Sequence, residues 1–242
     1  MGGHQSKYDA TNFETAQGGL TKTILSTQPP LSATETFVLR KESAMNKREY
    51  TVSDSEQHTI YTTKLVPGTA YWFDLLDKAG KPNIRIARTN MLNITWDLFS
   101  IDAPMWEGQE CDETIAEKCK DDNAKLYRLG QFKFSAMGQS RGDFFLYQSS
   151  DEKDKRGVLD TSTSLLLVEK VRSMKQKFQT MTPDNTNSLI GYWDWSGNAL
   201  QLRLAAGTDV ALHSIAAVIT HMIVMQQAAG VGAGAGAGTG AF

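Results

Sequence analysis

Four basic side chains within eight residues, Lys170, Arg172, Lys175 and Lys177, are the densest chemical feature of this 242-residue sequence. On one continuous strand, Lys170 and Arg172 would face one way and the two later lysines the other, because strand side chains alternate. A turn or bulge near Ser173 would instead gather all four. Such a cluster predicts binding to anionic lipid headgroups, and the simpler alternative is ordinary outward-facing charge. A second basic group comprises Arg40, Lys41, Lys47 and Arg48.

The opening residues M-G-G-H-Q-S fit the M-G-x-x-x-[ST] pattern for N-myristoylation. Acylation would use the amine of Gly2 after removal of Met1, and Ser6 stands at the required spacing. One myristoyl chain holds a membrane only marginally, so a second anchor is needed, and a basic patch would supply it. The alternative is a plain terminus or a cloning scar.

Two cysteines and two histidines are the remaining candidates for metal chemistry. Cys111 and Cys119 flank seven residues but match no zinc spacing, so we expect free thiols on a solvated loop. His213 and His221 are eight residues apart, about two helical turns, and could share a face as metal ligands or a pH switch. Hydrogen-bonded core imidazoles are the preferred interpretation, and the sequence predicts neither a metal site nor a cofactor.

Composition and motifs exclude several classes of function. The net charge of -2 and the pI of about 6.1 argue against a globally basic nucleic-acid binder. Acidic clusters at residues 107–122 and 151–154 lack an EF-hand pattern, so we expect solvated loops. The sequence contains no nucleophile elbow, P-loop, dinucleotide fingerprint or zinc-protease motif, and we therefore expect a protein that is not an enzyme.

The elements that must position these residues are mainly strands. Short alternating segments separated by turn signals, among them Pro67-Gly68, Lys78-Ala79-Gly80 and Gly142, predict a sandwich or barrel. Twelve strand candidates span residues 36–41, 49–53, 58–65, 70–76, 83–88, 93–100, 126–135, 143–148, 164–171, 174–181, 189–195 and 199–205.

One segment, Asp209 to Gln227, has no strand alternation and predicts a helix that is apolar around nearly its whole circumference. Nineteen residues would be roughly 28 Å long, just enough to span a bilayer. Because His213, Ser214, Thr220 and His221 lie inside it, a helix buried in a protein core is favoured over a lipid-exposed span.

The sequence divides into three parts. Residues 1–35 are polar and predict a flexible N-terminal segment. Residues 36–228 form the predicted domain, with an acidic insertion at about 105–125. Residues 229–242 are nearly pure glycine and alanine and predict a disordered tail.

Several segments resemble the LURP-one-related branch of the tubby C-terminal superfamily. They are F-V-L-R-K at Phe37–Lys41, I-Y-T-T-K at Ile60–Lys64, the hairpin F-D-L-L-D-K-A-G-K-P-N-I-R-I-A-R at Phe73–Arg88, I-T-W-D-L-F at Ile94–Phe99 and G-T-D-V-A-L at Gly207–Leu212. The resemblance covers about residues 36–228. It implies a closed antiparallel barrel of about twelve strands around one C-terminal hydrophobic helix. The acidic insertion departs from the family pattern.

The resemblance transfers a fold better than a function, because the family pattern has no fixed catalytic residues. Tubby-type relatives bind phosphoinositides on basic barrel surfaces. Two cysteines and no secretory segment favour a reducing, cytoplasmic location. We therefore expect a non-enzymatic, membrane-peripheral module that binds anionic lipid and unidentified protein partners, with Gly2 as the lipidation site and the 170–177 cluster as the lipid-binding site.

Two alternatives remain open. Phospholipid scramblases share the superfamily, and in a scramblase-like protein the terminal helix would insert into the bilayer. However, the cysteine-rich and proline-rich tracts of scramblases are missing here. A soluble structural component of a larger assembly is the other alternative, with the polar lead and the Gly-Ala tail ordering on docking.

Overall fold

The computed structural model describes residues 29–41, 49–69, 71–90, 95–116, 124–134, 141–149, 155–170, 177–182, 189–196 and 199–235. The strands are β1 (Glu35–Lys41), β2 (Tyr50–Ser53), β3 (Thr59–Leu65), β4 (Trp72–Asp77), β5 (Pro82–Asn90), β6 (Thr95–Ile101), β7 (Leu126–Phe134), β8 (Arg141–Gln148), β9 (Val158–Leu159), β10 (Leu166–Lys170), β11 (Lys177–Met181), β12 (Leu189–Ser196) and β13 (Ala199–Leu204). The helices are α1 (Glu113–Ala116) and α2 (Val210–Ala235). All twelve predicted strands are present, and their described boundaries agree with the prediction to within two residues except at the start of β11, where residues 171–176 lie outside the described part of the chain.

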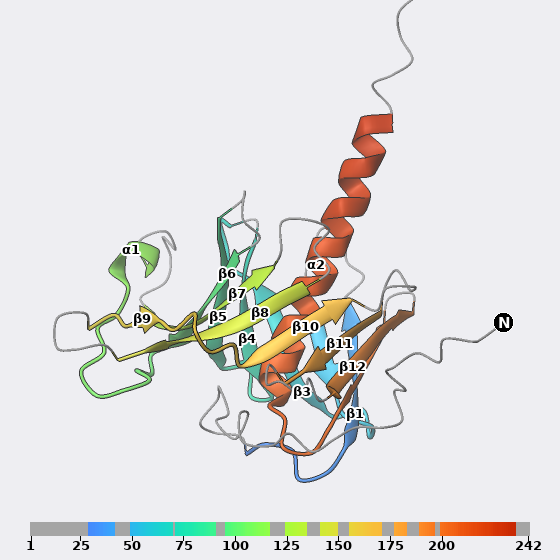
Figure 1. The fold of residues 1–242 in the computed structure, drawn as a ribbon, viewed down its shortest axis with the longest axis horizontal. Helices are drawn as coiled ribbons and strands as arrows, with labels where there is room; N and C mark the ends of the chain where they lie inside the picture. Colours follow the sequence, from blue (N-terminus) through green and yellow to red (C-terminus); the bar gives the residue numbers. More distant parts are fainter. Residues whose placement is uncertain are drawn as a thin grey trace, which may run out of the picture.

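The strands form one closed antiparallel barrel, as expected (Figure 1). Each strand pairs with its neighbour in the order β10-β11-β12-β13-β1-β2-β3-β4-β5-β6-β7-β8, and β8 pairs back onto β10. This last pairing, Leu166 with Phe144 through Glu169 with Arg141, closes a ring of twelve among the described strands. Closure leaves no open sheet edge in the ring.

The strand β9 was not predicted and lies outside this ring. It pairs with the C-terminal end of β8, Tyr147 with Leu159 and Gln148 with Val158, whereas β10 pairs with the N-terminal end. The segment is only two residues long and Gly157, which precedes it, has a φ of 88°. Its pairing depends on tertiary contacts rather than on hydrophobic alternation, so the sequence pattern could not reveal it.

Alternating side chains give the barrel an apolar interior. In β1, Phe37 and Leu39 point inward and are buried, whereas Arg40 is exposed. Glycine at position 142 is part of this packing and not a turn, which corrects the prediction from sequence. Gly142 lies in β8 opposite Phe134, and a Cβ there would stand 2.5 Å from the Phe134 ring.

The helix α2 runs through the middle of the barrel (Figure 1). The Asp209 carboxylate accepts hydrogen bonds from the backbone N–H groups of Ala211 and Leu212, at 2.8 and 3.2 Å, and so caps its first turn. From Ala211 to Thr220 every side chain is buried, which confirms the predicted core helix. The ribbon continues past the predicted end at Gln227 to Ala235 and projects beyond the strands.

Within the described residues, no helix is both long enough and apolar enough to be a candidate membrane span.

Residues 102–116, 124–125 and 155–160 pack together outside the barrel, and we call them the outer platform. A second hydrophobic cluster, separate from the interior, joins Ile115 of α1 to Trp72 and Phe99 on the outer face of the wall. The Asp112 carboxylate is buried and accepts a 2.8 Å hydrogen bond from Nε of Arg128. The acidic insertion was expected to be a solvated loop. This expectation is wrong for its described part, because an apolar anchor and a buried ion pair hold it against β7.

Candidate functional site

The described bases of the two basic groups, Arg40 and Lys41 of one and Lys170 and Lys177 of the other, lie at the same end of the barrel. The pairing register places Arg40 opposite Ala199, and Ala199 opposite Ser196 at the end of β12. Lys177 is paired with Asp194, two residues from that same end of β12. The described ends of β1, β10 and β11 therefore meet at one rim.

The helix α2 leaves the barrel at this rim, which we call the exit rim. The Tyr50 hydroxyl lies 2.8 Å from Nδ1 of His221, late in the buried part of the helix, and Tyr50 is paired with Lys41. Three strand spacings separate β11 from β1, about 14 Å around the wall. One membrane surface or one extended polyanion can therefore contact both basic groups.

The 170–177 cluster is a β-hairpin and not a continuous strand. Lys170 ends β10, Lys177 begins β11, and Lys170 is paired with Phe178, so the chain reverses between them. The register gives the two end positions opposite faces of the wall, because Lys170 is paired with the inward-facing Phe178 and Lys177 is the residue before Phe178. The hairpin therefore brings both positions to one end of the barrel, and the gathering of all four bases stays a prediction. Arg172 and Lys175 lie outside the described residues, as do Gly2, Lys47 and Arg48.

Acidic residues also border the exit rim. Glu169 precedes Lys170 and accepts a hydrogen bond from Gln179 Nε2 at 3.3 Å. Asp194 is the cross-strand neighbour of Lys177. These two carboxylates offset part of the positive charge of the four described bases, Arg40, Lys41, Lys170 and Lys177.

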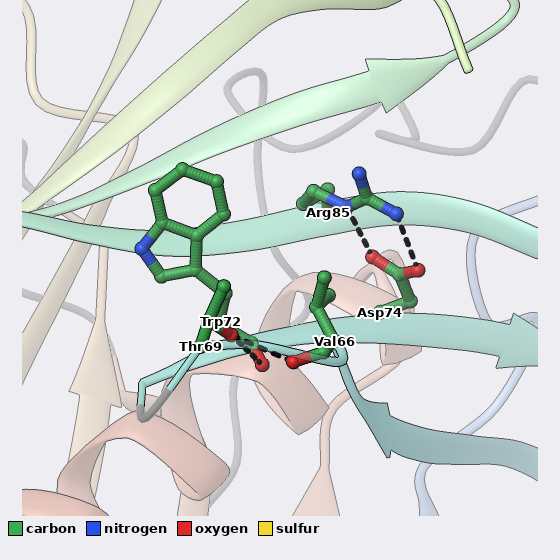
Figure 2. Close-up of polar contacts among 5 residues, drawn as sticks. All are labelled: Val66, Thr69, Trp72, Asp74 and Arg85. Atoms are coloured by element: carbon green, nitrogen blue, oxygen red, sulfur yellow. Dashed lines mark hydrogen bonds and ion pairs between the residues drawn. The ribbon is translucent and has the colours of Figure 1, made fainter. Parts of the chain in front are cut away.

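A bidentate ion pair lies elsewhere in the described chain, in the hairpin of β4 and β5 (Figure 2). Nε and one terminal nitrogen of Arg85 donate to the two carboxylate oxygens of Asp74, each at 2.8 Å. The Arg85 side chain is 3% exposed and that of Asp74 15%. Because this bidentate geometry uses both carboxylate oxygens, we interpret the pair as structural rather than as an anion-binding site.

The turn of the same hairpin explains why the pair is aligned. Asp77 Oδ1 accepts hydrogen bonds from the backbone N–H groups of Ala79 and Lys81, and Gly80 has a φ of 77°. The backbone hydrogen bond from Lys81 and its companions lower the pKa of the exposed Asp77 carboxyl. The sequence analysis identified the turn but missed the pair. The signal in the sequence was that Asp74 and Arg85, which carry opposite charges, occupy outward-facing positions on either side of a tight turn.

Both helix histidines are hydrogen-bonded core imidazoles, as predicted. Nδ1 of His213 lies 2.8 Å from the Asp209 carbonyl oxygen, and burial lowers the pKa of His213 to about 4. Burial, followed by the charge of Lys41, lowers the pKa of His221 to about 4 as well. No cluster of three or more His, Cys, Asp or Glu side chains suited to a metal ion exists within the described ranges. The thiol of Cys111 is free, and Cys119 lies outside the described residues.

A polar group on the outer wall ties the platform to the barrel. Arg128 lies 5.4 Å from the centre of the Tyr147 ring and pairs with Asp112, while Gln109 Nε2 donates to the Arg128 carbonyl at 2.9 Å. Burial, with a contribution from Asp97, raises the pKa of Tyr147. These groups satisfy one another and serve to hold the platform in place.

Comparison with known proteins supports the fold alone. No protein-family profile matches the sequence, and no curated protein matches it either. The X-ray structure of the Arabidopsis thaliana protein AT5G01750 is similar, with a TM-score of 0.53 and 15% sequence identity. The match covers 85% of this chain and 99% of the plant protein. The two proteins therefore share an architecture along nearly the whole of the plant chain.

Breaking the buried ion pair should destabilise the barrel. We expect Asp74→Asn to lower the free energy of unfolding by about 3 kcal/mol, because it removes the negative charge opposite the buried Arg85 guanidinium. Urea denaturation followed by tryptophan fluorescence measures the change. The matched control is Asp74→Leu with Arg85→Met, which removes both charges beside Trp72 and Phe99 and should recover most of the loss. A double variant less stable than Asp74→Asn would contradict this account.

The buried histidines should make stability depend on pH. An unfolded histidine takes up a proton below about pH 6.5, whereas His213 and His221 in the barrel resist protonation down to about pH 4. Their contribution is therefore present above pH 6.5 and is lost as the pH falls toward 4. We expect His213→Gln to reduce the loss of unfolding free energy between pH 7 and 5 by about 2 kcal/mol. An unchanged pH slope in this variant would show that His213 does not titrate on unfolding.

Proposed function

We propose that this protein is a non-enzymatic, membrane-peripheral binding module that presents its exit rim to anionic lipid headgroups on the cytoplasmic face of a membrane. The observation that carries the proposal is that the described bases of the two groups, Arg40, Lys41, Lys170 and Lys177, lie at one end of a closed barrel. The other four bases of the proposal, Lys47, Arg48, Arg172 and Lys175, belong to the segments that follow β1 and β10 along the chain. Clustered bases at a rim can touch a flat surface together, which the same bases scattered over a wall could not do.

The packed interior favours a surface function. The helix α2 and the inward side chains fill the barrel with buried apolar groups from Phe37 to Ile223. A binding module of this kind must therefore recognise its ligand through rims, loops and the outer wall. Phosphoinositides are the preferred lipid class in this proposal, because several phosphates on one headgroup can engage several bases at once.

The anchor in this proposal is a myristoyl group on Gly2. A single myristoyl chain gives weak and reversible membrane binding, and a polybasic surface is one of the second signals that make it stable. The two parts are complementary, since neither the acyl chain nor four to eight bases would hold the protein on a membrane alone.

The fold also bears on membership of a family and on the scramblase alternative. We propose a distant relation to the LURP-one-related proteins, on the hairpin Phe73–Arg88 and the barrel with its central helix. A scramblase-like insertion of α2 would have to extract the buried side chains of Ala211 to Thr220 from the barrel, exposing its whole inner wall. That cost favours the peripheral module.

The outer platform is the surface that we assign to protein partners. The two most exposed large hydrophobic side chains of the described residues, Met105 (42%) and Val158 (50%), both belong to it. The same platform carries three exposed acidic residues, Glu107, Glu110 and Glu113. A partner segment with basic and apolar side chains would suit this surface.

Removing the hairpin charges should weaken binding to anionic vesicles. We expect Lys170→Gln, Arg172→Gln, Lys175→Gln and Lys177→Gln together to lower the partition coefficient on phosphoinositide-containing liposomes at least tenfold, since each base near the surface contributes about 1 kcal/mol. Liposome flotation at fixed salt measures it. The matched control changes four exposed lysines at the opposite end of the molecule, Lys78, Lys81, Lys125 and Lys155, to glutamine and alters net charge equally. Equal losses in both variants would argue against a specific rim.

The acyl anchor predicts a separate phenotype in cells. The intact N-terminal mass of the natural chain should show loss of Met1 and addition of a myristoyl group, and Gly2→Ala should move the protein from the membrane fraction to the supernatant. If both proteins resist alkaline extraction, the helix spans lipid and the scramblase alternative gains. If both are in the supernatant, the scaffold alternative gains and the N-terminal pattern is a coincidence.

A further inference from the structure

A glycine on the inner wall lets the central helix approach the strands closely. Gly191 of β12 is paired with Thr180 on one side and Leu204 on the other. A Cβ at position 191 would overlap the Thr180 hydroxyl and stand 3.0 Å from Cδ2 of His213. The Thr180 hydroxyl and the edge of the His213 ring therefore meet over the same glycine, in the fully buried interior.

The hydrogen bond at the other ring nitrogen fixes the state of this histidine. A carbonyl oxygen only accepts, so the 2.8 Å contact with Asp209 requires Nδ1 of His213 to carry the proton. The side chain is 0% exposed, and burial disfavours the doubly protonated ring. His213 is therefore neutral at pH 7, and Nε2 presents a bare lone pair next to Cδ2.

This lone pair has no hydrogen-bond partner among the described residues, and neither does the Thr180 hydroxyl, which belongs to a fully buried side chain. Both groups lie beside Gly191, since a Cβ there would meet the Thr180 hydroxyl and Cδ2 of His213, the ring atom next to Nε2. One acceptor and one potential donor thus lie in one small region between α2 and the wall.

We propose that this region is a binding site for one ordered water molecule, which donates a hydrogen bond to Nε2 of His213 and bonds to Oγ1 of Thr180. Water fits because it offers two donors and two acceptors, and buried waters in proteins bond to two to four polar groups. The same molecule connects the first turn of the helix to β11.

A metal ion suits the region less well. A threonine hydroxyl is a poor metal ligand, and the described chain gathers no set of three His, Cys, Asp or Glu side chains. This water has a structural role, unlike a ligand bound in a functional cleft. The water fixes the rotation of α2 about its axis and its depth in the barrel, because only one orientation of the helix brings Nε2 of His213 to Gly191.

A crystal structure of the full chain tests the proposal directly. At a resolution of about 1.8 Å, a density peak should lie roughly 2.6–3.2 Å from both Nε2 of His213 and Oγ1 of Thr180. A direct Thr180–His213 hydrogen bond, or an empty position in a map that shows other buried waters, would overturn it. Nitrogen NMR of labelled histidine is the independent measurement, and a proton on Nε2 rather than Nδ1 would equally overturn it.

A conservative pair of variants separates the water from simple packing. Thr180→Ser keeps the hydroxyl and Thr180→Val keeps the shape. We expect the unfolding equilibrium constant of Thr180→Val to exceed that of Thr180→Ser about tenfold, because only the valine removes a partner of the bound water. Equal constants would count against a hydrogen-bonded water. If Thr180→Val fails to fold, the crystal and NMR measurements on the natural chain still decide.

Discussion

Filling the interior of a closed twelve-strand ring is the constraint on which the rest of this structure depends. Side chains alone fill a barrel of about eight strands, and a wider ring leaves a space that must be occupied. The helix α2 occupies it, with every side chain from Ala211 to Thr220 buried. Because its whole circumference meets the wall, the helix must be apolar on all sides, and this explains a composition that resembles a membrane span.

Most of this architecture could be read from local sequence patterns. Alternation such as Ile84 and Ile86 against Arg85 marks a wall strand, and a helix apolar all round, entered through Asp209, marks the core. The closing pair of β8 and β10 could not be found this way, since it depends on which strands meet after the whole ring has formed. The resemblance to a known barrel supplied that information instead.

The candidate site was less accessible to prediction. The two basic groups were visible, but their meeting at one rim follows from registers that link β1 to β11 through β12 and β13. The Asp74–Arg85 pair and the platform held by Asp112 and Arg128 join residues 11 and 16 positions apart. Spacing in the sequence does not predict such contacts unless the turn between the two residues is already known. The charged residues of the insertion predict a solvated loop, and only the buried side chain of Ile115 explains why the insertion folds back onto the wall.

The position of α2 after every strand in chain order has a consequence for biosynthesis. The ribosome synthesises the strands of the wall before the core helix α2. The inward faces of β1 to β13 therefore leave the exit tunnel with nothing to cover them. The pairing of β1 with β13 also joins the earliest and latest strands, which delays ring closure until translation is nearly finished. The apolar inner wall therefore stays uncovered for most of synthesis, and a chain stopped before residue 210 would release a wall with no core.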